Sequence, residues 1–294
     1  MISELAPAKI NLFLHVGPLR PDRLHDLRSV FVFADYGDII EISPGDDISL
    51  TIDGPFADDL GGEPLQKNLV WKAADRLREA GQVKTGAKIK LIKNLPIAAG
   101  IGGGSADAAA ALRGLQRLWK TELNRAALHR LAFSLGADVP ACLSRVPVEV
   151  SGAGEVISPA RPLPPLWVCL VNPRVPMATG AIFRAFDGQS GTPKPPLMPV
   201  LSRPTVAGVV DLMANSVNDL EVFAKTKAPV VGETVSFLAR SKGCIAARMS
   251  GSGATCFGLF ASKAAAQRAA IQAGAFGWWA ASAGLFGHGS GRGT

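Results

Sequence analysis

The stretch LPIAAGIGGGSADAAAALRGL, residues 95–115, contains four glycines within five positions, at 100 and 102–104. It lies between a basic, strand-like run and an alanine-rich segment with the composition of a helix. Bare N–H groups at a helix start and the helix dipole bind anions, and glycine lets a phosphate approach without a side chain in the way. The stretch therefore predicts a phosphate site, which suits a nucleoside triphosphate.

Two common phosphate-binding fingerprints do not match this stretch. The chain contains no G-x-x-x-x-G-K-[ST], and G-x-G-x-x-G would need glycine where Ser105 stands. A plain structural alternative is a tight strand-to-helix turn in which Ser105 caps the helix and Asp107 favours the helix dipole. One or two glycines would suffice for such a turn, so four of them favour the phosphate site.

A second glycine turn, SGSGA at residues 250–254, joins two strand-like runs. By itself it is most simply a hairpin turn, for which one glycine is enough. Two glycine turns in one chain favour a nucleotide site that both of them share.

Length and composition limit the class of protein. The 294 residues favour two domains over one very large one, and 48% hydrophobic with 19% charged residues is typical of a globular protein. The N-terminus has an acid and a strand-like alternation where a signal peptide has a basic start and an apolar core, so we expect a cytoplasmic, soluble protein.

Four widely spaced cysteines predict buried free thiols. The net charge of +7 fits either nucleic acid or an anionic small substrate, but the basic residues are dispersed and there is one tyrosine, which argues against a stacking surface for nucleic acid.

The first half of the chain reads as strands followed by helices. Residues 8–16 alternate as a half-buried strand whose second face carries Lys9, Asn11, Phe13 and His15. Short runs punctuated by Gly, Pro and Asp suggest an antiparallel sheet, and a helical pattern then ends at a glycine. The predicted elements are strands at 28–33, 38–43, 48–52 and 87–92, and helices at 68–81, 105–120 and 124–136.

The second half mixes strands and helices, which predicts an α+β sandwich. Four prolines within residues 158–165 suggest a domain boundary or a rigid crossover. We predict an N-terminal domain over 1–157, a C-terminal domain over 158–287 and a disordered tail at 288–294. The predicted elements are strands at 166–173 and 277–284, a strand, glycine turn and strand over 244–262, and helices at 179–186, 229–243 and 262–274.

Three motifs resemble, in order and spacing, those of the GHMP kinase superfamily. They are PAKINLFLHV (7–16), LPIAAGIGGGSADAAAAL (95–112) and MSGSGATCFGLF (249–260). Further strings resemble the branch of that superfamily whose acceptor is 4-diphosphocytidyl-2-C-methyl-D-erythritol, in the non-mevalonate isoprenoid route. These strings are RPDRLHDLRSVFVFADYGD (20–38), KNLVWKAA (67–74), LGADVPACL (135–143) and NSVNDLE (215–221).

The resemblance implies a two-domain α+β fold. Its N-terminal domain has a mixed or antiparallel sheet with helices, its C-terminal domain is a ferredoxin-like α/β sandwich, and the active site lies between them. The implied reaction transfers the γ-phosphoryl group of ATP, with Mg²⁺, to the 2-hydroxyl of the acceptor. The implied binding partner is this small molecule, and neither nucleic acid nor a membrane is expected to bind. The protein itself is expected to be a monomer or a weak homodimer.

The resemblance also assigns residues. Lys9 and Asp138 are implied at the reacting hydroxyl: a carboxylate accepts a proton, and a nearby ammonium keeps it ionised and offsets developing charge. The residues implied for ATP are Asn68, Lys93, Pro96, Ala98, Ala99, Gly100, Ile101, Gly102, Gly103, Gly104, Ser105 and Ala106. Those implied for the acceptor are Asn11, His25, Phe31, Asp138, Thr179, Phe183, Gly251, Ser252 and Gly253. No metal ligand is assigned.

Each main residue has a plainer interpretation. Lys9 on a strand is commonly a solvated charge, Asp138 a turn residue, His25 an exposed loop histidine, and Phe183 a core aromatic.

The chain also departs from the pattern of its relatives. It reads DRLH where the branch usually has DGYH, so that Leu24 replaces an aromatic ring beside the cytosine and Arg23 replaces a glycine. Ala106 stands where the usual loop has a second serine. Two alternatives remain: another GHMP kinase of the homoserine or mevalonate type, or a basic, non-catalytic RNA-binding protein with steeply salt-dependent affinity.

Overall fold

The computed structural model describes residues 1–62, 64–188 and 198–287, so the predicted tail at 288–294 lies outside the described residues. The strands are β1 (Ile2–Leu19), β2 (His25–Gly45), β3 (Ile48–Asp53), β4 (Gly86–Ile92), β5 (Val148–Gly152), β6 (Val156–Pro159), β7 (Trp167–Asn172), β8 (Cys244–Met249), β9 (Cys256–Phe260) and β10 (Trp279–Gly284). The α-helices are α1 (Leu69–Ala80), α2 (Gly103–Trp119), α3 (Arg125–Leu135), α4 (Val139–Cys142), α5 (Thr179–Asp187), α6 (Val206–Ala214), α7 (Glu221–Lys227), α8 (Val230–Arg240) and α9 (Lys263–Gly274). Two short 3₁₀ helices cover Asp58–Leu60 and Leu65–Lys67.

The chain divides into two compact units, each assembled from separate segments. Unit 1 comprises Met1–Ala8, Tyr36–Ile97 and Gly102–Ser144. Unit 2 comprises Lys9–Asp35, Ala98–Ile101 and Arg145–Thr294. Strands β1 and β2 therefore contribute residues to both units. The predicted division between residues 157 and 158 concerns consecutive segments and stays a prediction.

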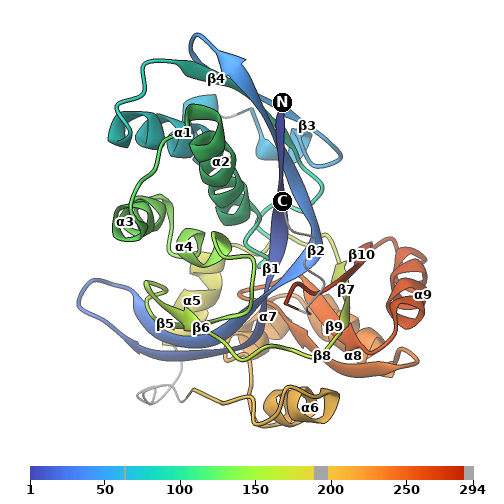
Figure 1. The fold of residues 1–294 in the computed structure, drawn as a ribbon. Helices are drawn as coiled ribbons and strands as arrows, with labels where there is room; N and C mark the ends of the chain where they lie inside the picture. The colour runs from blue at the N-terminus through green and yellow to red at the C-terminus, as the bar shows by residue number, and fades with distance from the viewer. Residues whose placement is uncertain (63, 189–197, 288–294) are drawn as a thin grey trace. The chain divides into compact units, whose positions relative to one another are not determined.

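In unit 1, helices α1 and α2 lie side by side, and strands β3, β4 and the later part of β2 form a sheet in that order (Figure 1). Asn68 caps α1, because its side-chain oxygen accepts the N–H of Val70 at 2.8 Å. Helix α2 is rich in alanine, the best helix former, and buries an unbroken run from Ala106 to Leu112. The core of this unit is thus a small-residue helix packed among aliphatic side chains.

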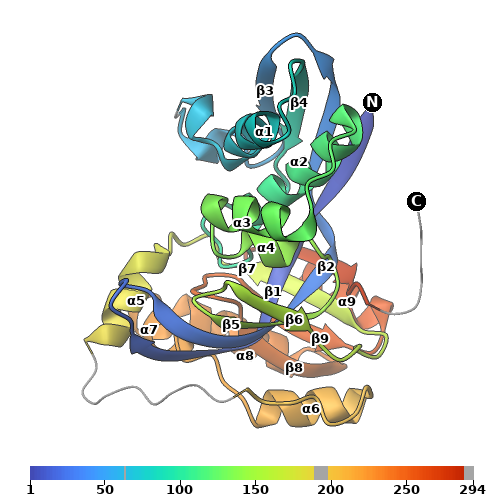
Figure 2. The same cartoon turned by 60° about the vertical axis from the view of Figure 1, so that its left-hand side comes forward.

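In unit 2, a four-stranded antiparallel sheet has the order β10-β7-β9-β8. Helix α9 packs on β7 and β10, and α8 packs on β8 and β9 (Figure 2). Strand β9 is buried at every residue, so its continuous apolar run CFGLF is that of a central strand. The early part of β2 pairs with β5, and β5 with β6. Helices on a sheet of this kind agree with the predicted α+β sandwich.

The first strand is longer and more buried than the sequence predicted. The prediction of a half-buried strand at 8–16 was wrong on burial, because Lys9, Asn11 and Phe13 on its second face are as buried as the aliphatic residues on the first. An alternating pattern normally indicates one solvated face, and here the polar positions face other parts of the protein instead.

The strands predicted at 28–33 and 38–43 are one strand, β2, which runs from His25 to Gly45. Gly37 was interpreted as punctuation, but a Cβ atom added there would collide with the carbonyl of Ala6 and lie 2.8 Å from Cα of Pro7. Glycine thus allows the backbone of β1 to approach β2 closely, which is the other role of glycine inside a strand.

The N-terminal sheet is mixed, one of the two arrangements that the resemblance implied, because it contains one parallel pair. Strands β3 and β4 run parallel, with Leu50 opposite Ile89 and Ile52 opposite Leu91. The connection between them contains α1 and supplies the crossover that a parallel pair requires. Strands β5 and β6 and helices α6 and α7 were not predicted.

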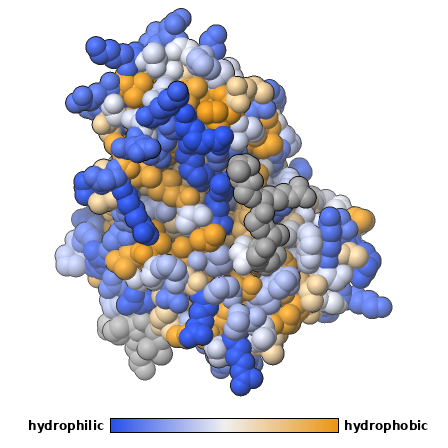
Figure 3. Space-filling model, viewed as in Figure 1, coloured by the Kyte–Doolittle hydropathy of each residue, from blue (hydrophilic) through white to orange (hydrophobic). Residues whose placement is uncertain are grey.

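Hydrophobic and hydrophilic residues are interspersed on the face shown in Figure 3. In the described part of the chain, no helix combines the length and the apolar character needed to cross a membrane. The large hydrophobic side chains with more than half of their surface exposed are Met1, Leu19, Val156, Val200, Val217, Val222, Ile271 and Phe276.

Candidate active site

The start of α2 carries two glycines that the protein's own packing does not require. Gly102 precedes the helix with a φ of 64°, a left-handed conformation that favours glycine. Gly103 and Gly104 are helical, and an added Cβ atom would lie 3.5 Å from its nearest neighbour at Gly103 and 3.6 Å at Gly104, which is ordinary contact. Neither conformation nor packing therefore explains glycine at 103 and 104. A ligand that lies on the bare backbone would explain both.

The alternative of a helix capped by Ser105 was wrong. Helix α2 begins at Gly103, so Ser105 lies inside its first turn, and Ala106 donates its N–H to the carbonyl of Gly102 at 2.8 Å. Asp107 is also not a surface group beside the dipole, because it is 3% exposed.

Within unit 2, the segment 98–101 packs directly on the second glycine turn. A Cβ added to Gly100 would collide with the carbonyl of Ser250 and lie 2.7 Å from the nitrogen of Gly253. Thr255 donates its N–H to the carbonyl of Ala99 at 3.1 Å, and the hydroxyl of Ser250 donates to the carbonyl of Gly100 at 3.0 Å. Gly100, the first glycine of the run, is therefore packed on the second glycine turn within unit 2.

Lys9 lies in a buried polar cluster of unit 2. Its Nζ donates to Oδ1 of Asn11 at 2.9 Å and lies 4.3 Å from the ring centroid of Phe31, within cation–π range. The amide of Asn11 donates to Ser29 at 3.0 Å. Lys9 is 4% exposed, so the alternative of a solvated surface charge was wrong. Three residues implied by the resemblance, Lys9, Asn11 and Phe31, are therefore neighbours.

Lys93 holds a second buried cluster, in unit 1. Its Nζ donates to Asp38 at 2.5 Å and to Asp107 at 2.8 Å, and all three residues are at most 3% exposed. Asp38 also accepts the backbone N–H groups of Asn94 and Leu95. A Cβ added to Gly103 would lie 3.5 Å from Nζ of Lys93, so this cluster lies directly beneath the start of α2.

One ammonium cannot balance two buried carboxylates. Oδ1 of Asp107 has no hydrogen-bond partner, whereas both oxygens of Asp38 have partners. Burial raises the pKa of Asp107 to about 8, against the attraction of Lys93 and with the help of the Asp38 charge. Asp107 is thus the carboxyl group that holds the proton near neutral pH.

Asp138 lies at the N-terminus of the short helix α4, where its carbonyl accepts the N–H of Cys142 at 3.2 Å. It is half-buried. Two residues earlier, a Cβ added to Gly136 would lie 3.9 Å from Oγ of Ser105. The turn that carries Asp138 therefore runs beside the first turn of α2.

His25 and Phe183 stack on each other in unit 2, with ring centroids 5.2 Å apart and an interplanar angle of 28°. The ring of His25 also contacts the carbonyl of Gly17 at 2.9 Å and Asp187 at 3.2 Å. His25 is 7% exposed, so the alternative of an exposed loop histidine was wrong. Phe183 packs partly against the core, as its own alternative proposed.

The remaining predicted residues lie on α5, on α2 and in the loops that follow β4 and β8. Thr179 opens α5, and its hydroxyl is 2.9 Å from that of Ser252 in the second glycine turn. Pro96, Ala98, Ala99 and Ile101 follow β4, with Ala98 in a left-handed conformation at a φ of 49°. Ala106 is fully buried in α2. Gly251 and Gly253 have φ values of 55° and 83°, which glycine alone adopts without strain.

Sequence reasoning missed the residues that support these groups. Asp38, Ser29 and Ser250 hold functional candidates through buried hydrogen bonds. Their polar side chains give no periodic signal of their own. The string NSVNDLE was noticed without a role, although Asn218 contacts the second glycine turn.

Two family models match this chain, one in its N-terminal half and one in its C-terminal half. Residues 68–145 match the GHMP kinases N terminal domain, and residues 202–277 match the GHMP kinases C terminal model. The 4-diphosphocytidyl-2-C-methyl-D-erythritol kinase of Paramagnetospirillum magneticum is 49% identical over 282 residues, covering 95% of this chain and 97% of that one.

Solved structures give the same result. A crystal structure of 4-(cytidine 5'-diphospho)-2C-methyl-D-erythritol kinase has a TM-score of 0.79 and 32% identity, covering 98% of this chain and all of that one. The homoserine kinase of Cytophaga hutchinsonii shares the fold at 18% identity, with a TM-score of 0.73 over 96% of this chain and 93% of that one. The fold is that of a GHMP kinase. Within that superfamily, the chain belongs to the 4-diphosphocytidyl-2-C-methyl-D-erythritol kinase family.

Proposed function

We propose that this protein transfers the γ-phosphoryl group of ATP to the 2-hydroxyl of 4-diphosphocytidyl-2-C-methyl-D-erythritol, in the non-mevalonate route to isoprenoid precursors. The observation that carries the proposal is the space at Gly103 and Gly104, where an added Cβ would meet the protein only at ordinary contact distances. Phosphates bound on a helix N-terminus need the backbone bare at these positions. The phosphate groups of ATP fit this requirement.

The chemical step needs little from the protein besides positioning and charge. The acceptor oxygen forms a bond to the γ-phosphorus, and the bond between that phosphorus and the bridging oxygen of ADP breaks, so that ADP leaves with the electron pair. Asp138 accepts the proton of the acceptor hydroxyl. The ammonium of Lys9, oriented by Asn11 and Phe31, stabilises the negative charge of the transferred group.

Magnesium is expected with ATP, since it neutralises phosphate charge as the bond breaks. Among residues 1–62, 64–188 and 198–287, no three His, Cys, Asp or Glu side chains are grouped to hold a metal ion. Mg²⁺ is usually held by one or two protein groups together with phosphate oxygens, so no such group is required. The hydroxyl of Ser105, in the first turn of α2, would supply one such protein ligand.

For the acceptor, we assign the cytosine to the aromatic pair of His25 and Phe183, whose ring planes are nearly parallel. Leu24 is 46% exposed and offers an apolar surface in place of a second aromatic ring. The turn that carries Gly251, Ser252 and Gly253, together with Thr179, binds the diphosphate through its backbone and hydroxyl groups.

The test is a coupled ADP-release assay with Mg-ATP and the cytidine acceptor, with homoserine, mevalonate and galactose in parallel. Release with the cytidine acceptor alone is expected. Release with another alcohol would reassign the acceptor, and no release with any of them would refute the proposal.

Two uncharged variants of similar shape, Lys9→Met and Asp138→Asn, test the roles of the reacting groups. Each should lower kcat by ~100-fold or more while leaving the fold intact, the scale of losing a general base or an electrostatic stabiliser. Normal turnover in both variants would remove Lys9 and Asp138 from the mechanism.

A further inference from the structure

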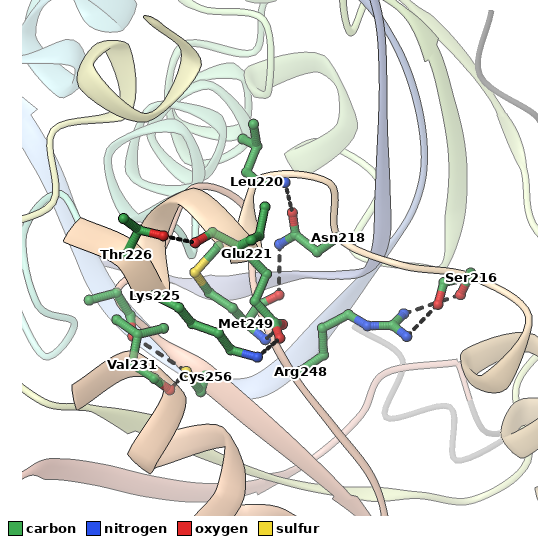
Figure 4. Close-up of polar contacts among 12 residues, drawn as sticks. Ser216, Asn218, Leu220, Glu221, Lys225, Thr226, Val231, Arg248, Met249 and Cys256 are labelled. Atoms are coloured by element: carbon green, nitrogen blue, oxygen red, sulfur yellow. Dashed lines mark hydrogen bonds and ion pairs between the residues drawn. The ribbon is translucent and has the colours of Figure 1, made fainter. Parts of the chain in front are cut away.

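The segment 215–221, NSVNDLE, has no role in the mechanism above, yet it is tied to the second glycine turn (Figure 4). Its last residue begins α7. The segment also runs alongside β1, because the N–H of Leu14 donates to the carbonyl of Val217 and the N–H of Asp219 donates to the carbonyl of Leu14. The segment is therefore held on one side by a strand that carries Lys9 and Asn11.

The side chain of Asn218 makes the most direct connection. Its Nδ2 donates to the carbonyl of Met249 at 2.9 Å and to that of Gly251 at 2.8 Å, while its Oδ1 accepts the N–H of Leu220 at 3.0 Å. Two acceptors on one side and a donor on the other are satisfied by a single amide orientation. Asn218 is 6% exposed, so both carbonyls depend on it away from bulk water.

Two charged residues tie the same region from either side. A carboxylate oxygen of Glu221 accepts the N–H of Met249 at 2.9 Å. The guanidinium of Arg248 donates to the carbonyl of Ser216 at 2.6 Å (Figure 4). It also donates to the carbonyls of Met213 at 2.7 Å and Leu12 at 2.8 Å. The end of β8 is thus fixed before the chain enters the turn at 250–254.

The turn itself connects to the candidate active site of unit 2. Ser250 accepts the N–H of Asn11 at 3.2 Å and donates to the carbonyl of Gly100 at 3.0 Å. A displacement of the carbonyl of Gly251 would therefore move the backbone that we assign to the acceptor diphosphate. Gly100 would also be displaced, because its backbone packs against Ser250 and Gly253.

We propose that Asn218 is a positioning residue, whose buried amide sets the conformation of the turn at 250–254 and thereby the affinity for the diphosphate of the acceptor. This proposal rests on the proposed function for its kinetic consequence. Its structural consequence, the order of the turn, is independent of activity.

The test is Asn218→Asp, with Asn215→Asp as the matched control. The new carboxylate keeps the acceptor for Leu220 but replaces the donor with an oxygen that faces two carbonyls, so both carbonyls lose the hydrogen bond from residue 218. Asn215 is exposed and donates its amide to the carbonyl of Asp211. The control therefore makes the same chemical change on the same segment without touching the turn.

Two measurements follow on the folded proteins. Hydrogen–deuterium exchange of a peptide covering residues 249–257 should be faster by ~10-fold or more in Asn218→Asp, and unchanged in Asn215→Asp. The KM for the cytidine acceptor should rise ~10-fold or more, with kcat within about threefold of the wild type.

If Asn218→Asp does not fold, Asn218→Ser replaces it, since its hydroxyl can satisfy one of the two carbonyls and should give an intermediate exchange rate. Unchanged exchange over 249–257 in a folded variant would overturn the proposal. So would a lower melting temperature with unchanged exchange there and unchanged KM, which would mark a purely structural role. An inactive wild type would refute the proposed function alone, because the exchange measurement needs no turnover.

Discussion

At the scale of single residues, Arg23 stands in a conformation that suits glycine. Its φ is 63°, a left-handed value that costs a residue with a side chain about 1–2 kcal/mol. The DGYH pattern that the resemblance implies has glycine at this position, and the left-handed conformation is a physical reason for glycine there. Arginine here makes the loop that carries Leu24 and His25 more costly to order.

We predict that Arg23→Gly raises the free energy of unfolding by about 0.5–1 kcal/mol, since the strain removed exceeds the entropy that glycine adds. Urea unfolding followed by circular dichroism measures it. The control is Arg161→Gly, an exposed loop residue outside the set with positive φ, which should lose stability by a similar amount. A loss of stability in both variants would contradict the strain argument.

The residues predicted from motifs were found together where they share an element or a turn. Lys9 and Asn11 are two apart on a strand, and their contact follows from that spacing. The stacking of His25 on Phe183 joins residues 158 positions apart in sequence, and only the resemblance suggested that both serve one base. Asp38 could not be predicted, because its carboxylate matters through Lys93 and through backbone N–H groups that no pattern in the sequence reveals.

At the scale of elements, the glycines around the first turn of α2 separate into two kinds. Gly100 is required by the protein, since an added Cβ would meet the backbone of Ser250 and Gly253. Gly104 has room for a side chain. The two kinds of glycine therefore predict different results when each is replaced by alanine.

We predict that Gly104→Ala leaves the fold as stable as the wild type or up to about 1 kcal/mol more stable, because alanine favours the helix. The KM for ATP should nevertheless rise ~10-fold or more, since the methyl group occupies the phosphate surface. Gly100→Ala should instead destabilise the protein by ~2 kcal/mol or more through backbone collision and positive φ. Unfolding curves and ATP titrations of both variants measure this, and an unchanged KM for ATP in Gly104→Ala would move the phosphate site elsewhere.

The buried cluster beneath α2 makes stability depend on pH. Burial raises the pKa of Asp107 in the folded protein to about 8, from an ordinary value near 3.8. The folded protein therefore holds a proton that the unfolded chain releases between these two values. The stabilisation is complete below about pH 4 and is lost as the pH rises towards about 8.

We predict that Asp107→Asn removes the part of the stability loss at rising pH that comes from the proton on Asp107. Relative to the variant, the wild type should lose stability at up to ~1.4 kcal/mol per pH unit between about pH 5 and 8. Urea unfolding of both proteins at several pH values isolates the difference, since the other titrating groups are common to both. Parallel pH profiles would show that Asp107 does not hold the proton.

Helices were predicted better than strand lengths and pairings. The capping and spacing signals of α1, α8 and α9 lie within or beside the sequence of each helix, so these helices can be predicted from their own segments alone. The length of β2 and the parallel pairing of β3 with β4 depend on which backbone lies beside them. A glycine that admits a neighbouring strand looks the same in sequence as one that ends a strand, as Gly37 shows.

At the scale of the whole molecule, the fold followed from three motifs spread over nearly the entire chain, whereas its division into units did not. Each unit takes residues from β1 and from β2: β1 gives Ile2–Ala8 to unit 1 and Lys9–Leu19 to unit 2. Because the units share these strands, we expect them to unfold together.

The four thiols provide the test. Cys142 belongs to unit 1 and Cys169, Cys244 and Cys256 to unit 2, and all of them are free. Burial raises the pKa of Cys169 to about 12 and that of Cys244 to about 11, so almost no thiolate exists near neutral pH in the folded protein. We predict that a thiol reagent labels the native protein slowly, and that in increasing urea the labelling of Cys142 and of Cys169 has one common midpoint, read by mass spectrometry of the separate peptides. Labelling of Cys142 at distinctly lower urea than Cys169 would mean that unit 1 opens alone, and the strands that both units share would then not couple their unfolding.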